Sequence, residues 1–111
     1  MRVELVTEGE RPLSPGVDLA AYRVIQEALT NVLKHASGAE AQIRLVYGES
    51  ELVITVTDDG GPAGYGHQDS PGGRGLIGLR ERVGLYGGAL DAGPRPGGGW
   101  RVRASFPLEP A

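Results

Sequence analysis

The chain has 111 residues, a length that indicates one domain, and 40% of them are hydrophobic, which is enough to form a core. It has no cysteine, which excludes disulfides, cysteine-ligated metals and thiol chemistry, and its net charge of −3 gives no electrostatic footprint for nucleic acid. No apolar run reaches the roughly 18 residues that a membrane-spanning helix needs. Glycine is in excess, with 19 residues where average usage predicts about eight. This excess indicates loops, or places where the backbone approaches a ligand closely.

The hydrophobic pattern predicts the order β-α-β-β-loop-α-β-β within a single domain that covers residues 1–111. Alternating apolar residues predict strands, and apolar residues three or four positions apart predict helices. The expected strands lie at 2–7, 41–47, 51–58, 89–92 and 100–106, and the expected helices at about 15–36 and 76–86. Two helices on one face of a mixed, mostly antiparallel sheet make an α+β, two-layer sandwich.

The first predicted helix carries two stripes. Its apolar residues are spaced for packing on a sheet: Ile25, Ala28, Leu29, Val32, Leu33 and Ala36. A second stripe places a carboxylate, an amide, an ammonium and an imidazole on one side of the helix: Glu27, Asn31, Lys34 and His35. Such a polar stripe is either a solvated helix face or part of a binding site, and the helix alone does not decide between them.

Asp58 is the most informative single residue. By period two it continues the inward face of Leu52, Ile54 and Val56, so its carboxylate points to the core side. Burying a carboxylate there without a partner is costly. Either Asp58 lies at the rim of a ligand pocket, or the strand has already ended and Asp58 caps the loop. Asp59 points the other way and is expected to be a loop residue.

Glycines dominate the region between the third strand and the second helix, where the sequence GGPAGYGHQDSPGGRG can bury almost nothing. Long loops of this kind are functional or disordered. Gly73, Gly75 and Gly78 open the second helix, where unpaired N–H groups and the helix dipole favour phosphate. The literal G-x-G-x-x-G is a weak dinucleotide signal because no strand precedes it. Arg80, Glu81 and Arg82 follow, and they either contact a ligand or pair with one another.

Three motifs resemble those of two-component sensor histidine kinases. QEALTN-x-x-KHA resembles the N box, TDDG resembles the start of the first glycine box, and GRGLIGLRERV-x-x-YGG resembles the second glycine box of the nitrate-sensor and DesK-like subgroup. GGGWRVRASFPL resembles the closing strand of the same domain, so the resemblance covers nearly the whole chain. It implies the Bergerat (GHKL) ATP-binding fold, which agrees with the element order predicted from the hydrophobic pattern.

The resemblance assigns roles to the polar stripe of the first helix. Asn31 would offer its amide oxygen to Mg²⁺, and Glu27 would be the general base or its orienter close to the metal. Lys34 and His35 would face the phosphates of ATP, with Lys34 taking part in catalysis.

The same resemblance assigns the nucleotide pocket. Asp58 would accept the adenine amino group, and Gly60 would let the chain pass close to the base. The segment 61–72 would form a lid whose hinge shifts towards Gly64, because Pro62 stands where the family usually has glycine. Trp100 replaces a common threonine and either walls the pocket or fills the core. The remaining ATP-binding positions are Gly73, Gly75, Leu76 and Gly78.

The function implied is that of the catalytic domain of a cytoplasmic histidine kinase, whether or not the full-length kinase is membrane-anchored. The domain would bind Mg·ATP and donate the γ-phosphate to a histidine on its own dimerisation domain, and the full kinase would serve a response regulator. Neither His35 nor His67 precedes an acidic residue as the family's acceptor does, so the isolated domain is not expected to phosphorylate itself. No contact of this domain with nucleic acid or membrane is expected.

Two alternatives stay open. One is an anti-sigma-type serine kinase of the same fold, which the second glycine box disfavours. The other is a nucleotide-binding module without turnover, which Glu27 and Asn31 disfavour because binding adenine alone needs neither.

Overall fold

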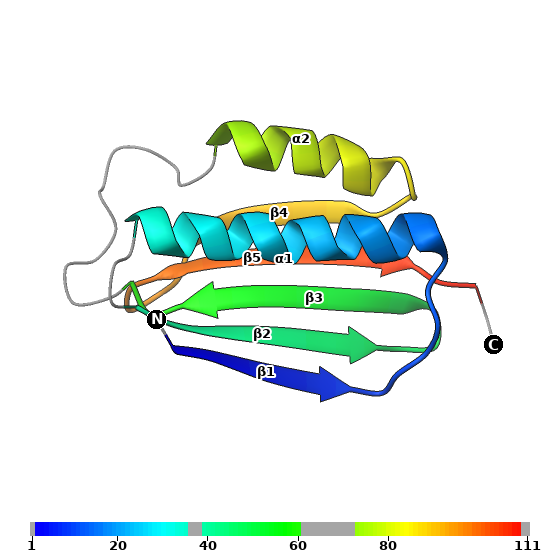
Figure 1. The fold of residues 1–111 in the computed structure, drawn as a ribbon, viewed down its shortest axis with the longest axis horizontal. Helices are drawn as coiled ribbons and strands as arrows, with labels where there is room; N and C mark the ends of the chain where they lie inside the picture. The colour runs from blue at the N-terminus through cyan, green and yellow to red at the C-terminus, as the bar shows by residue number, and fades with distance from the viewer. Residues whose placement is uncertain (1, 36–38, 61–72, 110–111) are drawn as a thin grey trace.

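The computed structural model describes residues 2–35, 39–60 and 73–109. Their elements confirm the predicted order: β1 (Arg2–Glu8), α1 (Pro15–His35), β2 (Glu40–Tyr47), β3 (Glu51–Asp58), α2 (Gly73–Gly84), β4 (Ala89–Pro94) and β5 (Trp100–Pro107) (Figure 1). The predicted start of α2 is late by about one turn, because Gly73, Arg74 and Gly75 already adopt helical backbone. None of the described helices combines the length and apolar character that crossing a membrane requires.

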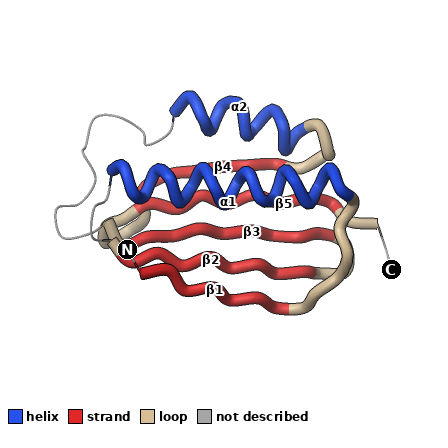
Figure 2. The backbone as a smooth tube through the Cα atoms, in the orientation of Figure 1, coloured by secondary structure: helices blue, strands red, loops and turns tan. Residues whose placement is uncertain are grey.

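The strands form one sheet in the order β1-β2-β3-β5-β4. β1 and β2 pair in parallel, with α1 as the connection between them, and the other neighbours are antiparallel. Figure 2 shows both helices on the same side of the sheet, so the α+β two-layer sandwich is confirmed. α2 packs against α1 and β4, whereas α1 packs over β2, β3 and β5.

Local signals place the element ends. The Ser14 hydroxyl accepts a hydrogen bond from the N–H of Val17 at 3.4 Å, and Pro15 is the first helical residue, as predicted for the start of α1. The predicted hairpin between β2 and β3 is closed by the N–H of Gly48, which donates to the carbonyl of Glu51 at 2.8 Å. After α2 the N–H of Gly88 donates to the carbonyl of Val83, which satisfies one of the last helical acceptors.

The core lies between the sheet and the two helices. The inward faces of β3 and β5 alternate as predicted and are buried: Leu52, Ile54, Val56, Val102, Ala104 and Phe106. Val24 of α1 and Val83 of α2 cover them and are also fully buried.

The predicted apolar stripe of α1 is partly wrong. Leu33 is 63% exposed, although Ala28 and Val32 are buried as expected. The buried face is centred on small side chains nearer the helix start and includes one polar residue: Val17, Ala20, Ala21, Val24, Ala28, Asn31 and Val32. Ile25 and Leu29 of the predicted stripe are partly buried and pack against the core, so the contact face is turned away from Leu33 alone among the described members of that stripe.

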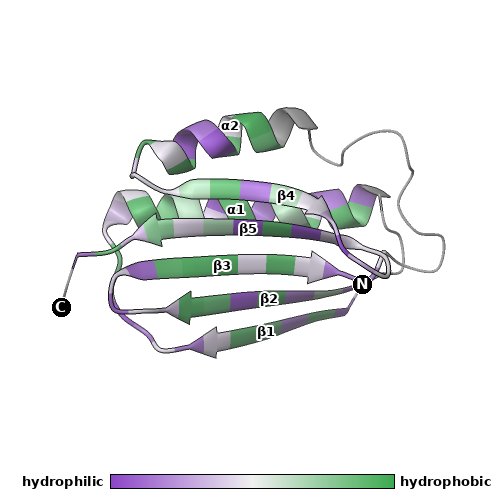
Figure 3. Ribbon diagram, turned by 180° about the vertical axis from the view of Figure 1, so that it is seen from behind, coloured by the Kyte–Doolittle hydropathy of each residue, from purple (hydrophilic) through white to green (hydrophobic). Residues whose placement is uncertain are grey.

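The sheet is covered only in part. Val3 and Leu5 lie on the helix side of β1, yet they are 44% and 63% exposed, because neither helix reaches this edge strand. The face opposite the helices is the one viewed in Figure 3, and it carries ion pairs between neighbouring strands, such as Arg44 with Glu8 and Arg101 with Asp91.

Phe106→Ala tests this core. We expect it to lower the free energy of unfolding by about 3–5 kcal/mol, because the side chain is fully buried and its loss leaves a cavity. Leu85→Ala is the control, since Leu85 is 81% exposed, and should change stability by less than about 0.5 kcal/mol. Urea unfolding measures both, and equal losses in the two variants would contradict the assignment of the core.

Candidate nucleotide-binding site

The predicted site residues gather at one end of the molecule. Figure 1 shows that α1 ends, β3 ends and α2 begins at the same end, where the turn between β4 and β5 also lies. The topology thus brings together Asn31, Asp58 and Gly73 from three segments that are distant in sequence.

Asn31 is a polar residue on the buried face of α1. It is 3% exposed, and its amide nitrogen has no hydrogen-bond partner among the described residues. A buried amide group without a partner costs about 1–3 kcal/mol. Packing alone does not favour asparagine at this position.

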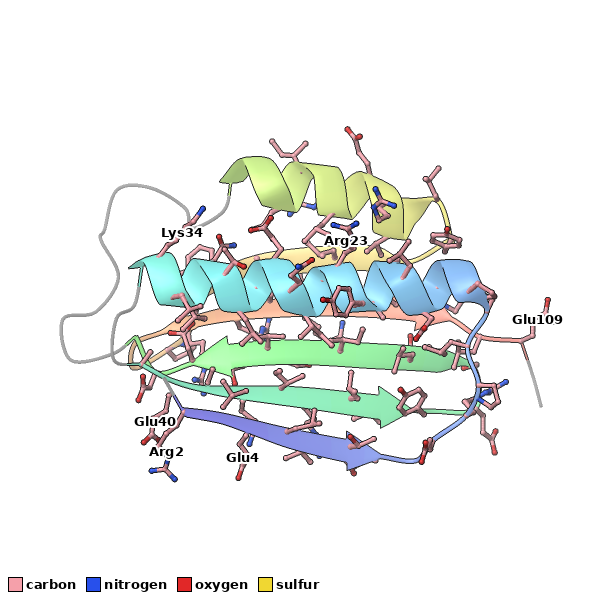
Figure 4. All side chains as sticks on the ribbon, viewed as in Figure 1. Arg2, Glu4, Arg23, Lys34, Glu40 and Glu109 are labelled. Atoms are coloured by element: carbon pink, nitrogen blue, oxygen red, sulfur yellow. The ribbon has the colours of Figure 1, made fainter. Side chains whose placement is uncertain are left out.

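A cleft of about 420 Å³ lies between α1 and α2, and its lining includes Thr30 and Lys34, close to Asn31 in sequence, but not Asn31 itself. Glu27 is half-buried in its wall, Lys34 is exposed at one end, and Figure 4 shows Lys34 pointing from α1 towards the side where α2 lies. Gly78 faces open space, because a Cβ placed there would meet no atom within 4 Å. The full lining is Arg23, Gln26, Glu27, Thr30, Lys34, Gly78, Leu79 and Arg82.

Asp58 is buried, at 2% exposed, at the end of β3 and on the core side, as the period-two pattern predicts. Its Oδ1 accepts a hydrogen bond from the N–H of Gly60 at 2.7 Å. The inward register is therefore confirmed, and the alternative in which the strand has already ended is wrong, because β3 includes Asp58. The carboxylate does cap the chain after the strand, and its place in a ligand pocket stays a prediction.

The turn between β4 and β5 braces the backbone of Asp58. Arg95 Nη1 donates to the carbonyl oxygen of Asp58 at 2.8 Å, and a Cβ added to Gly99 would lie 2.0 Å from that oxygen. Sequence reasoning missed both residues and treated the segment only as a turn. The run Gly97–Gly99 was the available signal, since consecutive glycines indicate unusual backbone or close approach.

Asp59 does more than the predicted loop residue would. Its Oδ1 accepts from the N–H of Glu40 at 3.0 Å, and its own N–H donates to the carbonyl of Glu40 at 3.1 Å. Asp58 and Asp59 line a second hollow of about 360 Å³ together with residues that include Arg2 and Arg95. The structure therefore distributes the predicted residues over two hollows: Glu27, Lys34 and Gly78 in one, and Asp58 in the other.

The other predicted positions fall into three groups. Gly64, His67 and the lid 61–72 lie outside the described residues. His35, Gly73 and Gly75 belong to the helix ends, whereas Leu76 is 6% exposed and packs in the core.

Two further residues have structural contacts. Arg80 Nε donates to the carbonyl of Leu90 at 3.1 Å, so this side chain ties α2 to β4. Trp100 is half-buried and packs against the core.

Residues 16–110 match the family of histidine kinase-, DNA gyrase B- and HSP90-like ATPases. The chain belongs to this family. Its nucleotide is therefore ATP.

Sensor histidine kinases are among the similar proteins. The chain is 35% identical to the sensor histidine kinase YxjM of Bacillus subtilis over 113 aligned residues, which cover 97% of this chain but 26% of YxjM. The histidine kinase domain of a blue-light-activated kinase from Erythrobacter litoralis is 26% identical, with a TM-score of 0.71 over 96% of this chain and 54% of that one. The catalytic domain of the histidine kinase ThkA, 15% identical over 96% of this chain and 77% of that one, shows the same fold with a TM-score of 0.73.

Gly99→Ala tests the bracing of Asp58. The new Cβ would collide with the Asp58 carbonyl, so we expect the turn and the end of β3 to shift and ATP affinity to fall by roughly tenfold or more, equivalent to about 1.4 kcal/mol. Gly97→Ala is matched, because Gly97 also has a positive φ (84° against 90°) but a Cβ there meets nothing. Both variants should lose about 1 kcal/mol of stability to backbone strain, and Gly99→Ala should lose more because of the collision. Calorimetric titration with ATP separates them, and equal affinities would contradict the bracing role.

Proposed function

We propose that the chain is the ATP-binding catalytic domain of a sensor histidine kinase and that it presents Mg·ATP to a histidine on another domain. The observation that carries this proposal is the buried, unpartnered amide of Asn31, one helical turn from Glu27 in the wall of the α1–α2 cleft. Family membership and the resemblance to YxjM support it.

The residues fit a nucleotide-borne magnesium ion. Among the described residues, no three His, Asp or Glu side chains cluster to hold a metal by themselves. Mg²⁺ characteristically keeps waters and takes few protein ligands together with substrate phosphates, so one amide oxygen from Asn31 suffices in this role. The atom without a partner among the described residues is the amide nitrogen, and turning the amide by 180° would place its oxygen at that position. Bound Mg²⁺ supplies neutralisation of the phosphate charge.

The other proposed contacts assign the adenine base and the phosphates to different residues. Asp58 accepts the adenine amino group, and its position is held by Gly60, Arg95 and Gly99. The opening turn of α2, from Gly73, offers backbone N–H groups to the phosphates. Lys34 lies in the α1–α2 cleft as a cation for the terminal phosphate, with His35 beside it in sequence.

The proposed reaction moves one phosphoryl group. A ring nitrogen of the acceptor histidine forms a bond to the γ-phosphorus while the bond to the bridging oxygen breaks, and ADP leaves. Glu27 takes the proton from the imidazole or orients it. Little covalent chemistry falls to the protein, so catalysis depends on positioning and on stabilising charge. A response regulator then serves as the downstream partner of the full kinase.

Asp58→Asn tests the base contact. A carboxylate at this position pairs with the adenine amino group and repels the guanine carbonyl, and a hydrogen bond to a charged group is worth roughly 1.5–3 kcal/mol. We therefore expect the natural protein to prefer ATP over GTP by at least about 10-fold, and Asp58→Asn to lose that preference. Asp59→Asn is the isosteric control and should keep it, since Asp59 contacts Glu40. Calorimetry measures the affinity of each variant for ATP and for GTP. Loss of the ATP preference in Asp59→Asn would show that the base binds on the opposite face of the sheet.

Asn31→Ala tests the catalytic role and the phosphate donor function together. Two proteins are mixed in this experiment. The full-length kinase carrying Asn31→Ala cannot phosphorylate itself and serves as the acceptor. The 111-residue chain, with ATP labelled at the γ-phosphate, serves as the donor. We expect label on the acceptor with the natural chain, none on the chain alone, and at least about 10-fold less transfer when the added chain also carries Asn31→Ala. Absence of Mg²⁺-dependent ATP binding by the natural chain would overturn the proposed function.

Measurements of stability show whether Asn31→Ala acts on the site or on the fold. Without nucleotide, Asn31→Ala removes an unpartnered polar group, so the unfolding free energy should change by less than about 1 kcal/mol. The neighbouring Val32→Ala, at a position 3% exposed, should cost about 2 kcal/mol yet retain Mg²⁺-dependent ATP binding. Equal effects of the two variants on stability and on binding would make Asn31 a packing residue.

A further inference from the structure

The α1–α2 cleft is cationic although the chain is not. Its lining carries three cations, Arg23, Lys34 and Arg82, against the single carboxylate of Glu27, on a chain with a net charge of −3. Figure 4 shows Arg23 pointing from α1 towards α2, on the same side of the helix as Lys34.

Arg23 and Arg82 are not used to hold the fold. Neither forms a hydrogen bond or ion pair within the described part of the chain, and both side chains are exposed. Most other arginines there are engaged with carboxylates or backbone carbonyls: Arg2, Arg11, Arg44, Arg80, Arg95 and Arg101. A pair of unengaged guanidinium groups on facing helices leaves excess positive charge in the cleft.

These two arginines lie too far along the helices to serve the phosphates. At 1.5 Å per residue, Arg23 is about 12 Å from Asn31 along α1, and Arg82 is about 13 Å from Gly73 along α2. Both displacements run away from the end at which the nucleotide is proposed to bind. Glu27 lies between Arg23 and Asn31 on the same helix, so the proposed proton acceptor separates the nucleotide from the arginine pair.

We propose that Arg23 and Arg82 are positioning residues that dock carboxylates of the phosphoacceptor domain, so that its histidine meets Glu27 and the γ-phosphate. This inference rests on the proposed function. The guanidinium fork binds a carboxylate through two parallel hydrogen bonds, which fixes orientation as well as attraction. An acidic surface beside the acceptor histidine would therefore complement this part of the cleft. Because the two arginines lie on separate helices, binding to both would fix the orientation of the docked domain.

Charge reversal tests the docking pair. The natural chain, Arg23→Glu, Arg82→Glu and the double variant are titrated with ATP, and each then phosphorylates increasing amounts of the Asn31→Ala full-length kinase. We expect ATP affinity within about twofold of the natural chain in every variant. For the double variant the KM for the acceptor should rise by roughly tenfold or more, with kcat changed much less, because docking charges act mainly on encounter and register.

Two controls make the outcome specific. Arg103→Glu introduces the same charge on the sheet face opposite the helices and should leave the KM for the acceptor unchanged. Arg82→Lys keeps the charge without the fork and should raise KM less than Arg82→Glu, and replacing an acidic residue near the acceptor histidine by lysine should restore part of the transfer by Arg82→Glu.

Each failure has its own meaning. Loss of ATP binding in Arg23→Glu or Arg82→Glu would place the arginines in the nucleotide site and overturn the docking role. An unchanged KM in the double variant would overturn it as well. Failure of the natural chain to bind ATP or to label the acceptor at any concentration would instead overturn the proposed function itself.

Discussion

The close packing of α1 on the sheet is the constraint on which the site depends. Small side chains such as Ala20, Ala21 and Ala28 form much of the contact face, so the helix axis can approach the strands closely. That approach fixes the rotation of the helix. It buries Asn31 near the end of the contact face and turns Glu27 and Lys34 towards α2. A bulkier contact face would lift the helix and loosen both the amide and the charged wall of the cleft.

The second fixed point, Asp58, is held by backbone rather than by packing volume. Its side chain meets the N–H of Gly60, and its carbonyl is met by Arg95 and lies against Gly99. These contacts come from both sides of the strand end, one from the chain leaving β3 and the other from the turn between β4 and β5. A carboxylate held in this way keeps its direction without a ligand, which is the preorganisation that the proposed recognition of adenine would use.

Sequence patterns predicted the elements and the inward register of Asp58, because alternation and helical spacing depend on local geometry that each segment carries by itself. They failed to predict burial at positions where burial depends on how far a helix extends over the sheet. Val3 and Leu5 have the alternation of a buried strand but lie beyond the reach of the helices, and Leu33 gives way to smaller residues at the contact face. The bracing by Gly99 was equally beyond a sequence pattern, since its partner is 41 positions away and no local rule connects them.

The buried Asn31 amide lowers the stability of the domain in the absence of a ligand. A domain of this size is stable by only about 5–15 kcal/mol, and an unpartnered buried amide takes a noticeable part of that. Packing alone would favour an apolar side chain at position 31, because the rest of the buried face consists of alanine and valine. A ligand that supplies the missing partner recovers the cost only when it is bound, so the penalty in the free state becomes binding free energy for that ligand. Under the proposed function, Asn31 trades stability of the empty domain for affinity.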